Sequence, residues 1–218
     1  MVRHHSAAHL RALSTVLGRV LVVALCALVT MTVPLSFPPG GGPTGVDRAV
    51  ATGVHDVLDG DSGLYQALAF PSNGYVVLPL LLAAVAWFGF RRQWRRAATM
   101  LAVPELTLAL NTWVLKPLWN RPLDDYLAYP SGHTVHLVAV ATTFALLTDS
   151  ARTRAVVAAV TALTMAAVTV GMIGLGYHYA TDVLGGIAAA IALPIVMCWA
   201  AAALAPDRTG RPRTPAMP

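Results

Sequence analysis

The sequence predicts an all-α membrane protein, a polytopic helix bundle with about six transmembrane helices and both termini in the cytoplasm. Its 218 residues are 56% hydrophobic and only 11% charged, whereas roughly a quarter of the residues in a soluble domain are charged. The apolar residues also fall in long blocks, and a membrane-spanning helix needs ~20 mostly apolar residues. The placement of the arginines then predicts how the bundle is oriented.

Six apolar blocks are the candidate spans: residues 19–37, 75–90, 97–118, 134–148, 154–177 and 183–204. The second and fourth are short for a span, so we expect them to extend through neighbouring polar residues or to tilt. The blocks also define the domain organisation: a cytoplasmic N-terminal segment (1–18), a membrane domain (19–204) and a cytoplasmic tail (205–218). The tail is rich in proline and arginine, and we expect it to be disordered.

The arginines favour one orientation, because basic residues in short loops stay on the cytoplasmic side. With the N-terminus inside, the inner segments hold most of the arginines, and the cluster from Arg91 to Arg96 is the strongest signal. The outer segments then hold only Arg48, Lys116 and Arg121. We therefore expect a multi-pass protein of the inner, or plasma, membrane.

Composition also argues against two other classes of protein. The basic residues are dispersed between apolar blocks instead of forming one basic face, which disfavours nucleic acid as a partner. Cys26 and Cys198 both lie inside apolar blocks, so they predict neither a disulfide framework nor a zinc site. No oligomeric state follows from the sequence.

The longest polar segment, residues 38–74, is expected to be an outer loop that opens with a proline- and glycine-rich turn. Within it, apolar residues recur near helical spacing at Val46, Val50, Val54 and Val57. This pattern predicts a short amphipathic surface helix. The valine stripe either packs against the bundle or forms one wall of a lipid entrance.

Two cations stand at the predicted outer end of the third span. Lys116 is the only lysine in the chain, and Arg121 follows it before a proline that stiffens the turn. Both are candidates for binding phosphate oxygens. Each has a simpler alternative, because Lys116 could extend its ammonium to the membrane interface and Arg121 could be an ordinary loop arginine.

Residues 129–133, Tyr-Pro-Ser-Gly-His, place a turn directly before an apolar helix. Backbone amides at such a helix start point at an anion, so Ser131 is a candidate phosphate-binding residue. His133 then offers a donor suited to protonating a leaving oxygen. Ser131 could instead serve only as an N-cap, and His136, three residues further on, is interpreted as a buried partner.

His178 and Asp182 are four residues apart, so on a helix they share a face and the carboxylate can accept the second imidazole hydrogen. The pair predicts a nucleophile with its orienting group. One alternative is an aromatic belt over residues 177–179 with Asp182 as a helix cap. Another is a metal site whose ligands would be His133, His136, His178 and Asp182.

Together these residues resemble the type 2 phosphatidic acid phosphatase superfamily, whose three motifs are Lys-six residues-Arg-Pro, Pro-Ser-Gly-His and Ser-Arg-five residues-His-three residues-Asp. Order and spacing agree over roughly the second half of the chain, and the middle motif is complete at residues 130–133. The resemblance implies that His178 attacks phosphorus, Asp182 orients it and His133 protonates the departing oxygen. It implies that the phosphoryl oxygens are held by Lys116, Arg121, Ser131 and the amide of Gly132.

The chain departs from the family pattern at two arginines. In the first motif the expected position holds Leu123, and Arg121 lies two residues earlier; in the third, the Ser-Arg pair falls on Gly171 and Met172. Losing one preorganised donor commonly costs ~2.7 to 4 kcal/mol of transition-state stabilisation. Either another group substitutes, or activity is weak, or the substrate differs. Arg48, the remaining outer cation, is one candidate substitute.

The resemblance implies a membrane lipid phosphatase whose active site faces the outside. The expected substrate is a lipid phosphate or diphosphate, of the polyprenyl or phosphatidic acid type, cleaved through a phosphohistidine without cofactor or metal. Two alternatives stay open. One is a phosphotransferase that uses an alcohol acceptor, and the other is a non-catalytic protein that binds or transports a lipid at a degenerate site.

Overall fold

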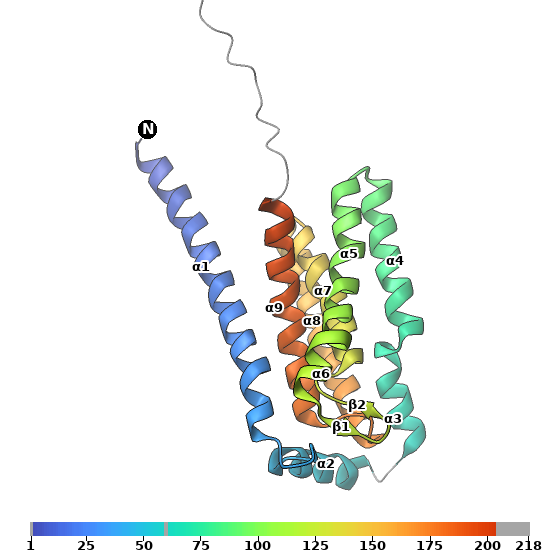
Figure 1. Ribbon diagram of the computed structural model, residues 1–218. Helices are drawn as coiled ribbons and strands as arrows, with labels where there is room; N and C mark the ends of the chain where they lie inside the picture. Colours follow the sequence, from blue (N-terminus) through green and yellow to red (C-terminus); the bar gives the residue numbers. More distant parts are fainter. Residues whose placement is uncertain (1, 59–60, 204–218) are drawn as a thin grey trace, which may run out of the picture.

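The computed structural model describes residues 2–58 and 61–203 as a bundle of helices (Figure 1). Six long helices of the described chain run along the bundle: α1 (Val2–Thr32), α4 (Gly74–Phe90), α5 (Trp94–Leu110), α7 (Gly132–Leu147), α8 (Ala151–Gly174) and α9 (Ala180–Ala203). The all-α membrane bundle predicted from the sequence is confirmed. The predicted disordered tail lies outside the described residues.

The short elements gather at one end of the bundle (Figure 1). They are the helices α2 (Gly45–Leu58), α3 (Ser62–Ala69) and α6 (Lys116–Trp119), and the strands β1 (Pro122–Leu123) and β2 (Tyr126–Leu127). The two strands pair antiparallel, with Leu123 opposite Tyr126, and form a small hairpin between α6 and α7. This end of the bundle carries the functional site.

Five segments are long and apolar enough to cross a membrane: Val16–Ser36, Ser62–Phe90, Trp94–Trp119, Ala151–Gly174 and Ala180–Ala203. The sixth candidate, α7, is apolar but has only 16 residues. The second segment begins at Ser62, well before the predicted start at residue 75, because α3 and a short 3-10 turn lead directly into α4. Likewise α1 begins at Val2, so the predicted N-terminal segment 1–18 is helical from that residue on and continuous with the first span.

The central helix of the bundle is α7, which explains how so short an apolar helix is accommodated. Val135, Val138 and Ala139 on α7 are all buried, and the core around them includes Leu81 of α4 and Met100 of α5. Because neighbouring helices cover most of the surface of α7, little of it contacts lipid, and its apolar length does not have to match the thickness of the bilayer. Its position also places its first residues, Gly132 and His133, inside the site.

The arginine-rich turn between α4 and α5 lies at the end of the bundle opposite α2 and the hairpin, and so do the start of α1 and the end of α9 (Figure 1). At this end Arg96 of α5 pairs with Asp149 of the α7–α8 loop at 2.8 Å. The arginine-rich end and the site end are therefore separated by the length of the bundle. This separation is what the predicted orientation requires, although the sidedness itself stays a prediction.

Helix α2 lies across the site end of the bundle, where a short amphipathic helix is predicted (Figure 1). The valine stripe does not form its buried face, because Val46, Val50 and Val57 are exposed. The residue that α2 buries is Asp47. Polar bonds, described below, therefore hold this helix in place, and the exposed valines are left on the surface.

Candidate active site

The start of α7 has two backbone amides that are free of any acceptor in the described chain. Ser131 caps the helix, since its Oγ accepts hydrogen bonds from the Thr134 amide at 3.4 Å and from the Thr134 hydroxyl at 3.1 Å. The amides of Gly132 and His133 have no acceptor among the described residues. Two backbone donors at a helix N-terminus are therefore free for an anion, while the hydroxyl of Ser131 has the simpler capping role.

The start of α9 is held against the start of α7. The Ser131 amide donates to the Asp182 carbonyl at 3.0 Å, which joins the second and third sequence motifs directly. The close approach depends on Gly185, where a Cβ atom would lie 2.2 Å from the ring of Tyr129. Tyr129 in turn donates from its hydroxyl to the carbonyl of Thr30 in α1. The glycine pair that follows Asp182 thus has a packing role.

A cavity of about 490 Å³ lies beside the α7 turn. Among its lining residues are all three histidines considered from the sequence and the only lysine: His133, His136, His178 and Lys116. Gly132, Tyr126 and Tyr177 also line it. The structure therefore brings together residues from α6, the hairpin, α7 and the α8–α9 loop, as the three-motif pattern predicts.

His133 and His178 face each other in this cavity, with ring centroids 6.0 Å apart. His178 is buried, and its Nδ1 atom lies 3.6 Å from Asp182 Oδ2. This separation is longer than a hydrogen bond, and Nδ1 has no other partner in the described residues. Catalytic hydrogen bonds are often long before substrate binds. The arrangement suits a nucleophile whose carboxylate partner tightens onto it during reaction.

Lys116 reaches the cavity through an irregular helix end. Residues Asn111–Leu115 form a π-helical turn between α5 and α6, and such turns frequently occur at functional sites. The Lys116 ammonium donates to the carbonyl of Leu127 in β2 and lies 5.8 Å from the ring of Tyr126. The side chain therefore points into the cavity.

Tyr126 lines the cavity but was not among the residues selected from the sequence. Its hydroxyl donates to the carbonyl of Tyr177, and its ring lies 6.0 Å from that of His178. Burial and the nearby Asp124 raise the pKa of Tyr126 to about 12, so the hydroxyl stays protonated at neutral pH. The hairpin turn between Leu123 and Tyr126, with Asp124 at positive φ, is the local signal that could have drawn attention to it.

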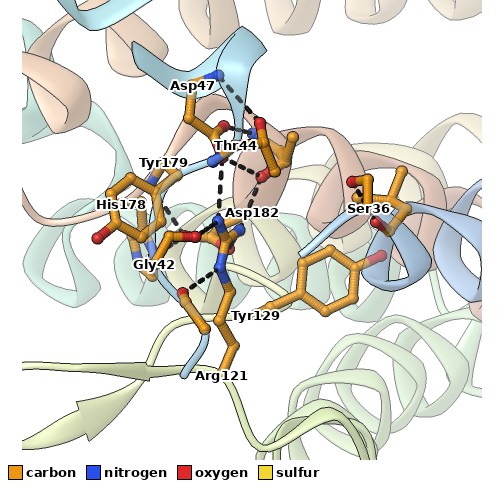
Figure 2. A network of polar contacts seen from close by, with 12 residues as sticks. Ser36, Gly42, Thr44, Asp47, Arg121, Tyr129, His178, Tyr179 and Asp182 are labelled. Carbon is orange, nitrogen blue, oxygen red and sulfur yellow. Dashed lines mark hydrogen bonds and ion pairs between the residues drawn. The ribbon is translucent and has the colours of Figure 1, made fainter. Parts of the chain in front are cut away.

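Arg121 is not at the cavity, contrary to the prediction that it binds phosphate. Its side chain is 0% exposed, and each of its guanidinium nitrogens already donates to protein oxygens (Figure 2). The partners are Asp182 Oδ1 at 2.6 Å, Asp47 Oδ2 at 3.0 Å, Thr181 Oγ1 and the carbonyls of Gly41 and Gly42. The two-residue shift in the first motif has placed this guanidinium behind the site, where it holds Asp182.

Asp47 is the second residue missed from the sequence, and it anchors α2 to α9. Its carboxylate accepts from the amide and hydroxyl of Thr181 and from the amide of Thr44, all within 3.0 Å (Figure 2). Although burial alone would raise the pKa of Asp47, these bonds and the one from Arg121 hold it below its usual value. The carboxylate is therefore charged in the folded protein, and it completes an Asp47–Arg121–Asp182 network.

The position of the missing third-motif arginine is filled by packing. Met172 is 1% exposed, and its sulfur lies 4.0 Å from Ser131 Oγ. A Cβ atom at the preceding Gly171 would lie 2.5 Å from the backbone nitrogen of Ala69 in α3. Helix α3 thus packs against α8 where the family pattern has Ser-Arg. Arg48 does not substitute, since it donates to the Pro43 carbonyl at 2.7 Å on the exposed side of α2.

The alternative of a metal site gains no support from the geometry. Within residues 2–58 and 61–203, no three His, Cys, Asp or Glu side chains are grouped closely enough to hold a metal ion. The carboxylate of Asp182 is instead committed to Arg121 and to the amide of Tyr179. The four proposed ligands are therefore divided between a cavity and an ion-pair network.

Comparisons with known proteins bear on the family and on the fold. A family model described as "PAP2 superfamily" matches residues 69–205, well over half of the chain. No curated protein sequence matches significantly. Among solved structures, the chain is similar to a transmembrane PAP2-type phosphatidylglycerolphosphate phosphatase from Bacillus subtilis, with a TM-score of 0.62 and 18% sequence identity. That match covers 87% of this chain and 98% of the other, and at this identity it supports the fold.

Proposed function

Because this chain belongs to the PAP2 superfamily, we propose that it is a membrane phosphatase that hydrolyses a lipid phosphate or diphosphate through a phosphohistidine intermediate. The observation that carries the proposal is the cavity in which His133 and His178 face each other beside Lys116 and a free helix start. A phosphoryl group between the two rings would meet a nucleophile, an acid and several oxygen-binding donors. Each of these parts is needed for phosphoryl transfer.

In the first half-reaction His178 attacks the phosphorus atom through Nε2. A phosphorus–nitrogen bond forms, the bond from phosphorus to the lipid oxygen breaks, and that oxygen takes its electron pair and the proton of His133. The Nδ1 hydrogen of His178 points towards Asp182, 3.6 Å away, whose negative charge stabilises the positive imidazole that develops. A phosphate monoester then releases the lipid alcohol, and a lipid diphosphate releases the lipid monophosphate.

In the second half-reaction water attacks the phosphohistidine. His133, now neutral, takes the proton from water as the new oxygen–phosphorus bond forms, and the phosphorus–nitrogen bond breaks back to His178. Inorganic phosphate leaves, and both histidines regain their starting protonation states. Lys116 and the amides of Gly132 and His133 bind the equatorial oxygens in both steps. Arg121 acts only indirectly, by holding Asp182.

The proposed substrate is a polyprenyl phosphate or diphosphate, or a lipid of the phosphatidic acid type. The similar Bacillus subtilis protein is described as acting on phosphatidylglycerol phosphate, which adds that lipid to the candidates. The arginine distribution supports an inner-membrane protein with the cavity at the outer face and both termini in the cytoplasm. Lipid phosphates exposed in the outer leaflet would then be the accessible ones.

The test is phosphate release from these lipids by the purified full-length protein. His178→Ala removes the attacking nitrogen, so we expect turnover to fall at least ~10³-fold, and a chelator should have no effect. His55→Ala, on the surface helix α2, is the matched control and should keep full activity. Retained activity in His178→Ala would contradict the mechanism.

A non-catalytic lipid-binding function is the second candidate, and one observation favours it. Lys116 is the only Lys or Arg side chain that lines the described cavity, so charge stabilisation is weaker than the family pattern provides. Binding of lipid phosphates without any phosphate release, and without release to an added alcohol acceptor, would support this candidate. Transfer to the alcohol in preference to water would identify a phosphotransferase.

A further inference from the structure

A second carboxylate–histidine pair lies next to the active site. Glu105 is the only glutamate in the chain and lies in the mostly apolar stretch of helix α5 that follows Arg95 and Arg96. Its Oε1 atom is 3.0 Å from Nε2 of His136 on α7. A carboxylate inside a membrane helix is costly to keep, and such residues usually mark a functional site. The pair therefore needs an explanation that packing alone does not supply.

The pair stands where two cavities meet. His136 lines the cavity that holds His133 and His178, and it also lines a second cavity of about 580 Å³ together with Glu105. Leu78 and Pro79 of α4 form part of the second cavity's wall, and Tyr75, which is 87% exposed, stands at its edge. This lateral cavity thus opens between α4 and α5 on the lipid-facing surface of the bundle.

The order of residues along α7 assigns each one to a part of the substrate. Gly132 and His133 begin the helix and would meet the phosphoryl group and the leaving oxygen in the proposed mechanism. His136 follows three residues later on the same face, which is about 4.5 Å further along the helix axis. The part of the lipid immediately beyond the leaving oxygen would therefore pass His136 on its way to the lateral cavity.

The free atoms of the pair indicate which chemistry it would accept. Nε2 of His136 is used by Glu105, and among the described residues Nδ1 has no hydrogen-bond partner and is not enclosed by protein. A protonated imidazole donates from both nitrogens, so it can bind Glu105 with one and an anion with the other.

The surrounding charges strengthen this interpretation. Met172 leaves the site without the arginine of the third motif, and Arg121 is committed to two carboxylates. Lys116 lies on the phosphoryl side of the cavity, where it binds the Leu127 carbonyl. A negative group on the leaving alcohol would otherwise meet no cation in this part of the site. His136 is the residue placed to meet it.

We propose that Glu105 and His136 form a leaving-group subsite that binds a second phosphate, the one next to the phosphate that is cleaved. This proposal rests on the function proposed above, since it takes His133 to mark the leaving oxygen. Two kinds of lipid carry such a group. In a lipid diphosphate it is the phosphate that remains on the lipid, and in a phosphatidylglycerol phosphate it is the phosphodiester.

The test compares pairs of substrates with and without the second phosphate, with the purified full-length protein; the farnesyl pair differs by that phosphate alone, and the phosphatidyl pair by a glycerol phosphate unit. Farnesyl diphosphate is paired with farnesyl phosphate, and phosphatidylglycerol phosphate with phosphatidic acid, and kcat/KM is measured from phosphate release. His136→Gln should lower kcat/KM roughly tenfold or more for the two-phosphate member of a pair, since a charged hydrogen bond is lost. The single-phosphate member should change by less than about twofold, and its rate shows that the variant is folded.

Glu105→Gln should cause a smaller loss with the same selectivity, because the amide oxygen can still accept the hydrogen bond that holds His136 but carries no charge. His55→Gln makes the same histidine substitution outside both cavities and should change no rate. A selective effect in the farnesyl pair alone identifies a diphosphate subsite, and one in the phosphatidyl pair alone identifies a phosphodiester subsite. An equal loss for both members of each pair, or no loss at all, would overturn the proposal.

A failure of the proposed function gives a different result, because the wild-type protein would then hydrolyse none of the four lipids. Binding still tests the subsite in that case. The dissociation constants of farnesyl methylenediphosphonate and farnesyl phosphonate, which cannot be hydrolysed at the bridging carbon, are compared for wild type and His136→Gln. If His136→Gln binds the diphosphonate more weakly than wild type does, but binds the phosphonate equally well, the result supports the subsite. If each ligand has the same dissociation constant for both proteins, the result overturns it.

Discussion

The cavity around Lys116 and the network around Arg121 each contain a cation that the sequence predicts to bind phosphate. The two regions differ in whether their hydrogen-bond donors already have acceptors within the protein. Each nitrogen of Arg121 donates to an oxygen of the protein, and the side chain is completely buried. In the cavity, by contrast, the amides of Gly132 and His133 have no acceptor among the described residues. A network whose donors all have acceptors within the protein stabilises the fold, whereas donors without acceptors at a cavity are available to bind a ligand.

Sequence spacing alone does not separate these two roles. Lys116 and Arg121 are five residues apart at the same end of the bundle, and a change of two residues in the motif decides which side of the hairpin the guanidinium reaches. The role of a cation is therefore assigned by its partners. The predictions below use matched substitutions in the two regions to test that assignment.

The largest effect on stability is expected for Arg121→Met. The change leaves the carboxylates of Asp47 and Asp182 buried without their shared cation, and breaking such a buried ion pair costs ~3 to 5 kcal/mol. The measurement is the free energy of unfolding in detergent micelles. Arg48→Met removes an exposed arginine from α2 and should change that free energy by less than about 0.5 kcal/mol.

If Arg121→Met unfolded at the wild-type denaturant concentration but bound phosphate much more weakly, the assignment of Arg121 to the structural network would be wrong. Arg121→Lys provides a further check. A lysine keeps the charge but cannot reach all of the oxygens that the planar guanidinium holds, so it should recover only part of the lost stability.

Lys116→Met is the matching substitution in the cavity, and we expect it to lower turnover and leave stability nearly unchanged. Removing one preorganised charge at the transferred phosphoryl group lowers kcat by roughly 10²- to 10³-fold. Stability should change little, because the ammonium binds a carbonyl and no carboxylate in the described structure. Initial rates of phosphate release measure the first effect and unfolding in detergent the second.

A loss of stability in Lys116→Met as large as that in Arg121→Met would erase the distinction between the two regions. Lys116→Arg serves as the charge-preserving control. It should retain more activity than Lys116→Met, since a cation remains at the site although its reach differs.

Asp47→Asn should have an intermediate effect, with a loss of ~1.5 to 3 kcal/mol of stability from weakened charged hydrogen bonds. The lowered pKa of Asp47 also predicts a pH dependence. A carboxylate with a depressed folded pKa contributes stability above its unfolded pKa of about 3.9 and loses it as the pH falls through the lower, folded value. Asparagine does not titrate, so below about pH 4 the unfolding temperature should fall less steeply in the variant than in wild type.

The opposite outcome, an identical acid dependence in wild type and Asp47→Asn, would mean that folding does not lower the pKa of Asp47. Asp56→Asn, at an exposed position of the same helix, controls for the general effect of removing a surface carboxylate. Its unfolding curve should follow that of wild type at every pH.

Most of the fold could be predicted because its signals are local. Blocks of apolar residues predict the long helices whatever their neighbours are, and the Ser131 cap and the four-residue spacing of His178 and Asp182 are properties of single segments. The second span extends beyond its predicted start at residue 75, as its short length indicated, although the sequence did not show that the extension is helix α3. Of the two interpretations of the valine stripe, packing against the bundle was wrong for Val46, Val50 and Val57, because the residue that α2 buries is Asp47.

The rest of the site could not be predicted because it depends on pairs that are distant in sequence. Asp47 and Arg121 are 74 residues apart, and Glu105 and His136 are 31 apart on different helices. No periodicity or motif connects such positions. Lys116, His133 and His178 could be found from the sequence because each lies inside a short motif, whereas Tyr126 depends on how the hairpin folds over the cavity.

The network around Arg121 also has a consequence for how related sequences diverge, since it holds two carboxylates against one guanidinium. A lineage that first lost Asp47 would keep a balanced Arg121–Asp182 pair. A lineage that first lost Arg121 would keep the buried carboxylates of Asp47 and Asp182 without their shared cation, and α2 would lose one of its contacts with the bundle. We therefore expect selection to tolerate loss of Asp47 before Arg121 and to remove loss of Arg121 before Asp47. The two positions should covary, with Asp47 found only where the arginine is retained.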